Sequence, residues 1–177
     1  MPGHAVAMPE RGRLLLAGLG GAACLSLIAT FVSAPAPRLV WNASRSAPLG
    51  LYRVYPGAAV AVGDMVITRL PKAVRRLAAD RQYLPNNVPL VKRVVAVGGA
   101  RICARGVTIT VAGPPVARRQ ARDRAGQPLA AWQGCRTLGR HEVFLLMAAV
   151  PDSFDGRYFG PITASDVIGK AVPLWVR

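Results

Sequence analysis

The longest apolar segment of the chain lies close to its beginning. Residues 14–32 read LLLAGLGGAACLSLIATFV and carry no charge over nineteen positions. A helix needs about twenty mostly apolar residues to span a bilayer. Arg11 and Arg13 precede this segment, and the next charged residue is Arg38, an asymmetry that favours a cytoplasmic N-terminus.

The pattern therefore predicts a single-pass protein of the cytoplasmic membrane. We expect a cytoplasmic tail over 1–13, a transmembrane anchor over 14–33 and one extracytoplasmic domain over 34–177. The alternative is a cleavable signal peptide with its small-residue site at 32–34, although the apolar run is longer than the ~7–15 residues usual for such peptides.

After the anchor, short apolar segments alternate with turns that contain glycine and proline. Residues 72–80 favour a short helix, and 113–128 and 151–160 favour exposed or polar loops. The pattern predicts a mainly β fold, a small antiparallel β-barrel or sandwich. The segments expected to form strands are 51–55, 58–62, 65–70, 89–97, 101–104, 107–111, 143–150 and 167–176.

Charge and cysteine content narrow the function classes. The formal net charge is +15, and twenty of the 23 basic residues are arginines scattered along the chain. Only 6% of residues are aromatic, whereas a nucleic-acid surface needs basic residues gathered with aromatics between them, so we expect no nucleic-acid partner.

Cys103 and Cys135 would share an oxidising compartment, where they could pair or remain free. The absence of a ligand motif argues against a metal or other cofactor.

One charged pair interrupts the most apolar strand candidate. Side chains alternate along a strand, so Lys92 and Arg93 should point to opposite faces. A buried lysine can lose its proton, whereas an arginine practically cannot, which makes Lys92 the better inward-facing base. Such a base could activate a serine hydroxyl, a poor nucleophile by itself. The alternative base is His141, because His4 precedes the anchor.

The serine nearest the anchor lies in a distinctive segment. Ser46-Ala47-Pro48-Leu49-Gly50-Leu51-Tyr52 resembles the S-x-P-x-G-L-Y signature of the TraF-like conjugative-transfer signal peptidases, a branch of the type I signal peptidases. Lys92-Arg93-Val94-Val95 resembles the lysine box of that family. Residues 153–160 (SFDGRYFG) resemble its S-x-D-S-R-x-x-G box and depart from it at Gly156, where serine is common.

The resemblance implies a role for each matching residue. Ser46 matches the nucleophile and Lys92 the general base of a Ser–Lys dyad. Ser44 and the backbone N–H of Ser46 match the oxyanion hole, and Ser153 matches the residue that orients the lysine. Asp155 and Arg157 match a supporting pair near the base.

The resemblance also implies the reaction and the partners. The chain would remove signal peptides from exported precursors, among them pilin-like subunits or other parts of a conjugation apparatus, while in contact with membrane lipid. A housekeeping type I signal peptidase and a non-catalytic assembly protein of a secretion or pilus complex are the alternatives.

Overall fold

The computed structural model describes residues 9–32 and 36–177, with side chains described from 9 to 26 and from 36 onward. The chain divides into two compact units, Met1–Ala36 and Pro37–Arg177, which we describe separately. In the first unit a single helix, α1, spans Glu10–Val32. The predicted 1–13 tail lies partly outside the described residues, because residues 1–8 do, and so do positions 33 and 34 of the alternative cleavage site.

Membrane spans can be assessed only in the described part of the chain. There, no helix is both long and apolar enough to cross a bilayer. The predicted transmembrane anchor over 14–33 is therefore not supported by the structure and rests on the sequence.

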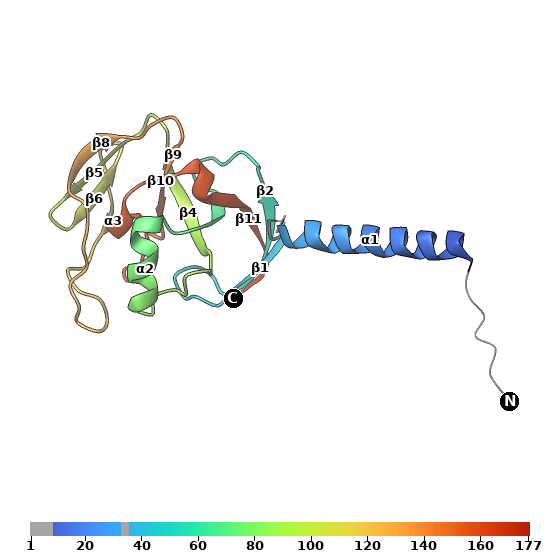
Figure 1. The fold of residues 1–177 in the computed structure, drawn as a ribbon. Coiled ribbons are helices and arrows are strands. Elements are labelled where there is room, and N and C mark those ends of the chain that lie inside the picture. The colour runs from blue at the N-terminus through green and yellow to red at the C-terminus, as the bar shows by residue number, and fades with distance from the viewer. Residues whose placement is uncertain (1–8, 33–35) are drawn as a thin grey trace. The chain divides into compact units, whose positions relative to one another are not determined.

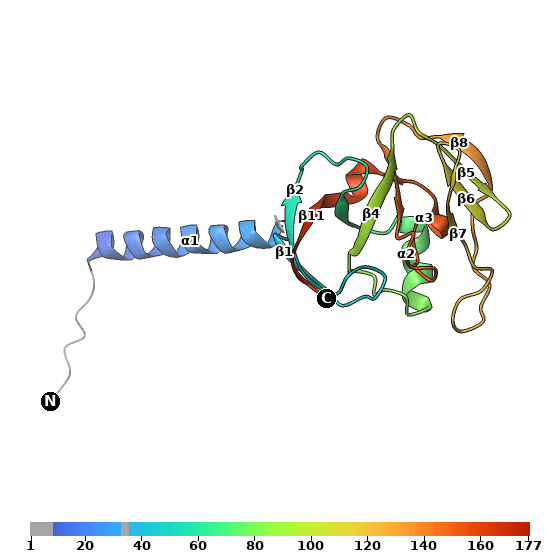
Figure 2. The ribbon, with the colours of Figure 1, turned by 180° about the vertical axis from the view of Figure 1, so that it is seen from behind.

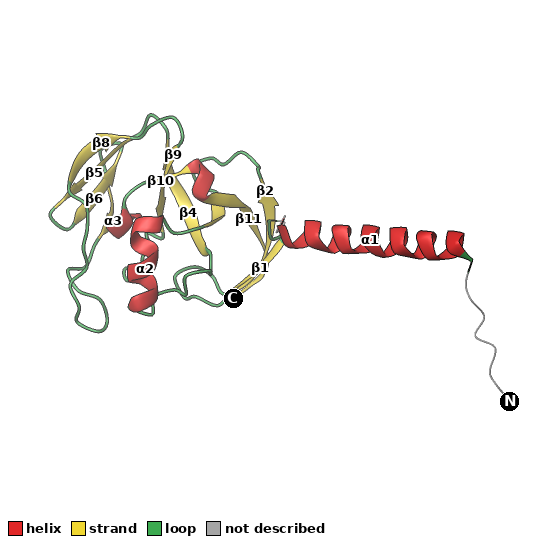
Figure 3. Ribbon diagram, viewed as in Figure 1, coloured by secondary structure: helices red, strands yellow, loops and turns green. Residues whose placement is uncertain are grey.

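The second unit is mainly β, as predicted, and its strands form two antiparallel sheets (Figure 1; Figure 3). The larger sheet has seven strands in the order β1-β2-β11-β3-β4-β9-β10, and the smaller has four in the order β7-β6-β5-β8. The strands of the larger sheet are β1 (Leu39–Asn42), β2 (Gly50–Pro56), β3 (Met65–Thr68), β4 (Leu90–Val97), β9 (Glu142–Leu146), β10 (Ile162–Thr163) and β11 (Val167–Val176). Those of the smaller sheet are β5 (Arg101–Arg105), β6 (Thr108–Val111), β7 (Pro115–Arg118) and β8 (Gly134–Thr137).

Burial of apolar side chains holds the two sheets together. Figure 2 shows β5, β6 and β8 grouped together at one end of the second unit. Ile102, Ala104 and Ile109 of the smaller sheet pack in one cluster with residues of β4 and β9, Phe144 among them. These side chains are at most 1% exposed, so the face that they share is dry. Burying an isoleucine or phenylalanine side chain contributes roughly 1.5–3 kcal/mol, so this cluster attaches the smaller sheet to the larger one.

The helices are few and short. The helix α2 spans Lys72–Asp80, as predicted, and buries Ala78. A single helical turn, α3, spans Gly156–Phe159 within the segment that was expected to be a polar loop, and a 3₁₀ turn follows at Ala164–Asp166.

Three predictions about individual segments were wrong. Residues 58–62 form no strand: most of their side chains are exposed, and Ala61 bonds locally to Asp64 through its backbone N–H and carbonyl. The loop predicted over 113–128 contains β7, which pairs with β6. The polar loop predicted over 151–160 contains the helical turn α3, and several of its polar side chains are buried.

The open question about the cysteines has an answer in the smaller sheet. Cys103 of β5 lies opposite Cys135 of β8 in the register, and the two sulfurs are bonded. The bond joins residues 32 positions apart along the chain, and it closes the loop that includes β6, β7 and the long connection to β8.

Candidate active site

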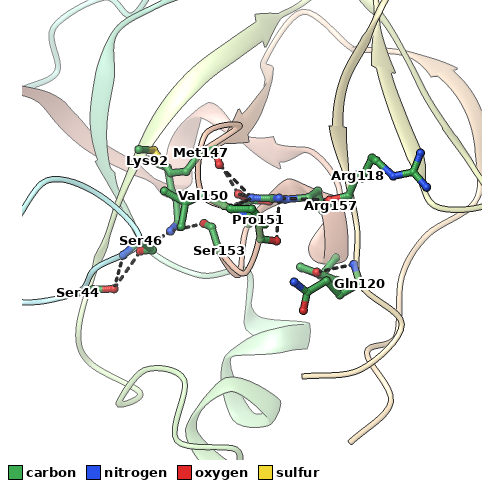
Figure 4. A network of polar contacts seen from close by, with 12 residues as sticks. Ser44, Ser46, Lys92, Arg118, Gln120, Met147, Val150, Pro151, Ser153 and Arg157 are labelled. Carbon is green, nitrogen blue, oxygen red and sulfur yellow. Dashed lines mark hydrogen bonds and ion pairs between the residues drawn. The ribbon is translucent and has the colours of Figure 1, made fainter. Parts of the chain in front are cut away.

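The loop between β1 and β2 carries the two serines that the sequence singled out. Asn42 and Gly50 face each other in the β1–β2 register, so residues 43–49 form the connection between them. Ser46 is half-buried and Ser44 is exposed. The Oγ atoms of the two serines are 2.9 Å apart, and the Ser46 backbone N–H donates to Ser44 Oγ at 3.3 Å. The loop thus holds both hydroxyls side by side (Figure 4).

A lysine from the centre of the larger sheet reaches this loop. Lys92 lies on β4 between β3 and β9, and it is 1% exposed, whereas its neighbour Arg93 is exposed, as side-chain alternation predicts. Lys92 Nζ donates to Ser46 Oγ at 2.7 Å and to Ser153 Oγ at 3.0 Å. Ser46, Lys92 and Ser153 therefore meet at one point, although they come from three distant parts of the sequence (Figure 4).

The Lys92 amine has unusual electrostatic surroundings. Burial lowers its pKa from 10.5 to about 8, while Asp155 raises this pKa and Arg157 lowers it. Its described hydrogen-bond partners are hydroxyls, not carboxylates. A fraction of the amine is thus neutral near pH 7–8, and a neutral amine can accept a proton from a hydroxyl at this distance.

The third segment of the site is fixed by a buried ion pair. Asp155 and Arg157 are 0% and 1% exposed, and their side chains meet at 2.8 Å. Arg157 also donates to the carbonyl oxygens of Met147 at 3.1 Å and Val150 at 2.6 Å. Asp155 accepts from the Met147 backbone N–H at 2.9 Å. These contacts stabilise the segment that carries Ser153 in the position from which Ser153 contacts Lys92.

Two features of the signature segment have a direct structural reason. Gly50 has φ +139°, and a Cβ there would lie 2.0 Å from the carbonyl oxygen of Trp175, so a side chain cannot be accommodated. Tyr52 is buried, and its hydroxyl donates to the Pro48 carbonyl at 2.8 Å. The glycine and the tyrosine thus shape the loop that presents Ser46.

The departure at Gly156 has a local explanation too. A Cβ at this position would lie 2.6 Å from the Leu145 carbonyl oxygen and 2.7 Å from the ring of Phe144. The serine common at this position in the family would clash with both, so this chain needs glycine beside Phe144.

The described residues offer little support for the alternative base, His141, or for a metal site. His141 is exposed just before β9, and no hydrogen bond joins it to Ser46 among the described residues. No group of three or more acidic, histidine or cysteine side chains is placed to hold a metal ion in that part of the chain.

All six residues assigned from the resemblance therefore lie in one connected network. Sequence reasoning missed Asn42, whose side chain makes four hydrogen bonds to the loop of Ser44 and Ser46. An asparagine side chain often closes a turn by accepting from the backbone N–H two residues later, a preference that could have pointed to Asn42. The catalytic roles of these residues stay predictions.

Comparisons with known proteins agree with the resemblance. The family model described as signal peptidase, peptidase S26, matches residues 12–176. A probable conjugal transfer protein TraF of Sinorhizobium fredii is 34% identical over 92% of this chain and 89% of its own length. A plasmid transfer protein TraF of Escherichia coli is 32% identical over 88% of this chain and 92% of its own. A signal peptidase I crystal structure from Enterococcus faecalis covers 64% of this chain and 97% of its own at 18% identity, with a TM-score of 0.37 that is too low to inform the fold.

Proposed function

The chain belongs to the signal peptidase family S26 and is similar to TraF conjugal transfer proteins, and on this basis we propose that it is a serine endopeptidase that removes signal peptides from exported precursors. Ser46 is the nucleophile and Lys92 is the general base. The observation that carries the proposal is the 2.7 Å contact between Lys92 Nζ and Ser46 Oγ, made by an amine that is buried and has a lowered pKa.

The first chemical step follows from these contacts. Neutral Lys92 accepts the Ser46 proton while Ser46 Oγ attacks the scissile carbonyl carbon, and Ser153 Oγ keeps the amine pointed at the nucleophile. Negative charge then develops on the carbonyl oxygen. The Ser46 N–H and the Ser44 hydroxyl are the donors proposed for it, and the substrate oxygen would replace their contact with each other.

The second step returns the enzyme to its starting state. The protonated Lys92 gives its proton to the leaving amine, and the signal segment remains as an ester on Ser46. Water then attacks the ester carbonyl while Lys92 again acts as base, which releases a carboxylate and restores the Ser46 hydroxyl.

The substrate class is proposed from the relatives. The proteins similar to this chain over most of its length are named as conjugal or plasmid transfer proteins. We therefore expect an exported precursor of a conjugation apparatus, such as a pilin-like subunit, whose signal segment ends in small residues. A housekeeping type I signal peptidase would instead accept many unrelated precursors.

The proposed location of the catalytic domain is the outer surface of the cytoplasmic membrane, with the N-terminus in the cytoplasm. The uncharged run over 14–32 supports it, as do large apolar side chains that the second unit exposes on β1 and β11. Leu39, Trp41, Leu174 and Trp175 are each more than half exposed. Alkaline extraction of membranes tests this placement, since an anchored chain stays in the membrane pellet and a peripheral one is released.

Cleavage of a candidate pilin precursor in membranes tests the enzymatic proposal. We expect the native chain to cut, and Ser46→Ala and Lys92→Met to lose at least ~10⁴-fold in rate while they remain folded. A His141→Ala variant serves as the control and should cut normally. Normal cutting by Lys92→Met would refute the proposed base, and restoration of pilus assembly by Ser46→Ala would favour a non-catalytic assembly role.

A further inference from the structure

Asn42 is a buried polar residue at the base of the loop that carries Ser44 and Ser46. It is the last residue of β1 and is 7% exposed, whereas Asn86 and Asn87 are both exposed. A buried amide usually has a structural or functional reason. Leaving its hydrogen-bonding groups unsatisfied costs roughly 1–3 kcal/mol of stability.

The side chain of Asn42 binds the loop at both of its ends. Its Nδ2 lies 3.0 Å from the carbonyl oxygen of Ser44, 3.1 Å from that of Ala47 and 2.9 Å from that of Pro48. Its Oδ1 accepts from the Ser44 backbone N–H at 3.1 Å. One carboxamide therefore connects the residue that precedes the nucleophile by two positions with the two residues that follow it.

The chemistry of the contacts requires an amide. Nδ2 has two hydrogens for three acceptors, so at least one hydrogen is shared, and Oδ1 serves one donor. A carboxylate of the same shape could accept from Ser44 N–H but would place an oxygen against three carbonyl oxygens. An alanine would leave all four backbone groups without this partner.

We propose that Asn42 is a positioning residue of the active site, one that holds the 43–49 loop so that Ser46 Oγ stays in reach of Lys92 Nζ and Ser44 stays beside it. This inference rests on the proposed Ser–Lys peptidase. Loops of this length are mobile unless tied down, and a displacement of about 1 Å in a catalytic group can reduce the rate about 100-fold.

The primary test is the kinetics of the full-length Asn42→Asp variant on a precursor peptide. We expect kcat to fall about 100-fold and KM to stay within about twofold, because the reacting groups are displaced while substrate contacts remain. Asn87→Asp introduces the same charge at an exposed asparagine and should change neither constant. A folded Asn42→Asp protein with native kcat would overturn the proposal.

A second measurement separates this role from a purely structural one and does not depend on activity. The chain has only three lysines, so ¹³C labelling at lysine Cε gives few signals to assign. In native protein we expect Lys92 to titrate with a pKa of about 8. In Asn42→Ala, which adds no charge, the loosened loop admits water and the pKa of Lys92 should rise toward 10.5, with Lys72 and Lys170 unchanged.

Failure of the positioning role of Asn42 can be distinguished from failure of the proposed peptidase function. If the native chain does not cut any precursor but the Lys92 pKa rises in Asn42→Ala, the peptidase assignment fails and the positioning role stands. If Lys92 titrates identically in native protein and in folded Asn42→Ala, the positioning role is refuted even when cleavage is observed.

Discussion

Two buried cations lie close together in this molecule and have opposite surroundings (Figure 4). Lys92 is 1% exposed, and its described hydrogen-bond partners are the hydroxyls of Ser46 and Ser153. Arg157 is equally buried but meets the Asp155 carboxylate at 2.8 Å and several backbone carbonyl oxygens. One cation is left without a directly bonded counter-charge, and the other is fully paired.

The difference suits the two residues to the roles proposed for them, Lys92 as a base and Arg157 as a support. A buried amine with neutral partners is destabilised in its charged form, so its pKa falls, and burial has this effect on Lys92. An arginine keeps its charge, and its fork of donors suits a carboxylate and several carbonyls together. We therefore assign the reactive role to Lys92, which no carboxylate contacts directly, and a supporting role to the paired Arg157.

Removing the counter-charge of the paired cation should have the largest effect. Asp155→Asn keeps the shape of the side chain but leaves the Arg157 charge buried without its partner. We expect the free energy of unfolding to fall by about 3–5 kcal/mol, as measured by denaturant titration. The pKa of Lys92 should fall as well, because Asp155 raises it.

A surface pair provides the matched control for that variant. Asp64 and Lys170 meet at 2.7 Å, and the Lys170 side chain is 38% exposed. Asp64→Asn should change stability little, since exposed pairs are weak. An equal loss in both variants would show that burial does not distinguish the two pairs.

Replacing Lys92, the unpaired cation, should raise the free energy of unfolding instead of lowering it. A fall in pKa from 10.5 to about 8 means that the folded state binds the Lys92 proton less tightly than the unfolded state, at a cost of about 3 kcal/mol below pH 8. Native stability should therefore rise as the pH increases from 8 to 10.5. Lys92→Met should be more stable than the native chain by up to about 3 kcal/mol at pH 7, a gain that vanishes above pH 10.5.

Thermal or denaturant unfolding at several pH values checks this expectation. Lys72→Met, at an exposed position of α2, is the control and should not alter the pH dependence. A Lys92→Met protein that is less stable than the native chain at pH 7 would mean that the amine is well stabilised where it lies.

The smallest effect is expected from Ser153, whose hydroxyl is proposed to orient the base. Ser153 Oγ accepts from Lys92 Nζ at 3.0 Å. A hydrogen bond to a charged group contributes about 1.5–3 kcal/mol, so Ser153→Ala should lower kcat about 10- to 100-fold with little change in KM. Peptide cleavage kinetics measure it, with exposed Ser165→Ala as control. An unchanged kcat would assign orientation of Lys92 to Ser46 and the sheet alone.

The sequence predicted the regular part of the fold well. The helix over 72–80 and the strands around residues 51–55, 89–97 and 167–176 are present because their apolar pattern and their sheet partners agree. Residues 58–62 have the same apolar pattern but pair with no strand, and most of their side chains are exposed. Pairing depends on the whole topology, which a local pattern does not contain.

In the candidate site, too, the local pattern predicted some features, and long-range contacts determine the others. Side-chain alternation was enough to place Lys92 inside and Arg93 outside, as the structure has them. The meeting of Ser46, Lys92 and Ser153 depends on contacts between residues 46 and 61 positions apart, so it came only from the family resemblance. The contribution of Asn42 arises from the closed shape of one loop, which no motif described.

Titration of Lys92 in the native full-length chain tests the central claim most directly. The ¹³Cε signal of Lys92 should report a pKa of about 8, which leaves a usable fraction of neutral amine beside Ser46. A pKa near 10.5 would mean that the amine is almost always charged, and it would contradict the assignment of Lys92 as the general base.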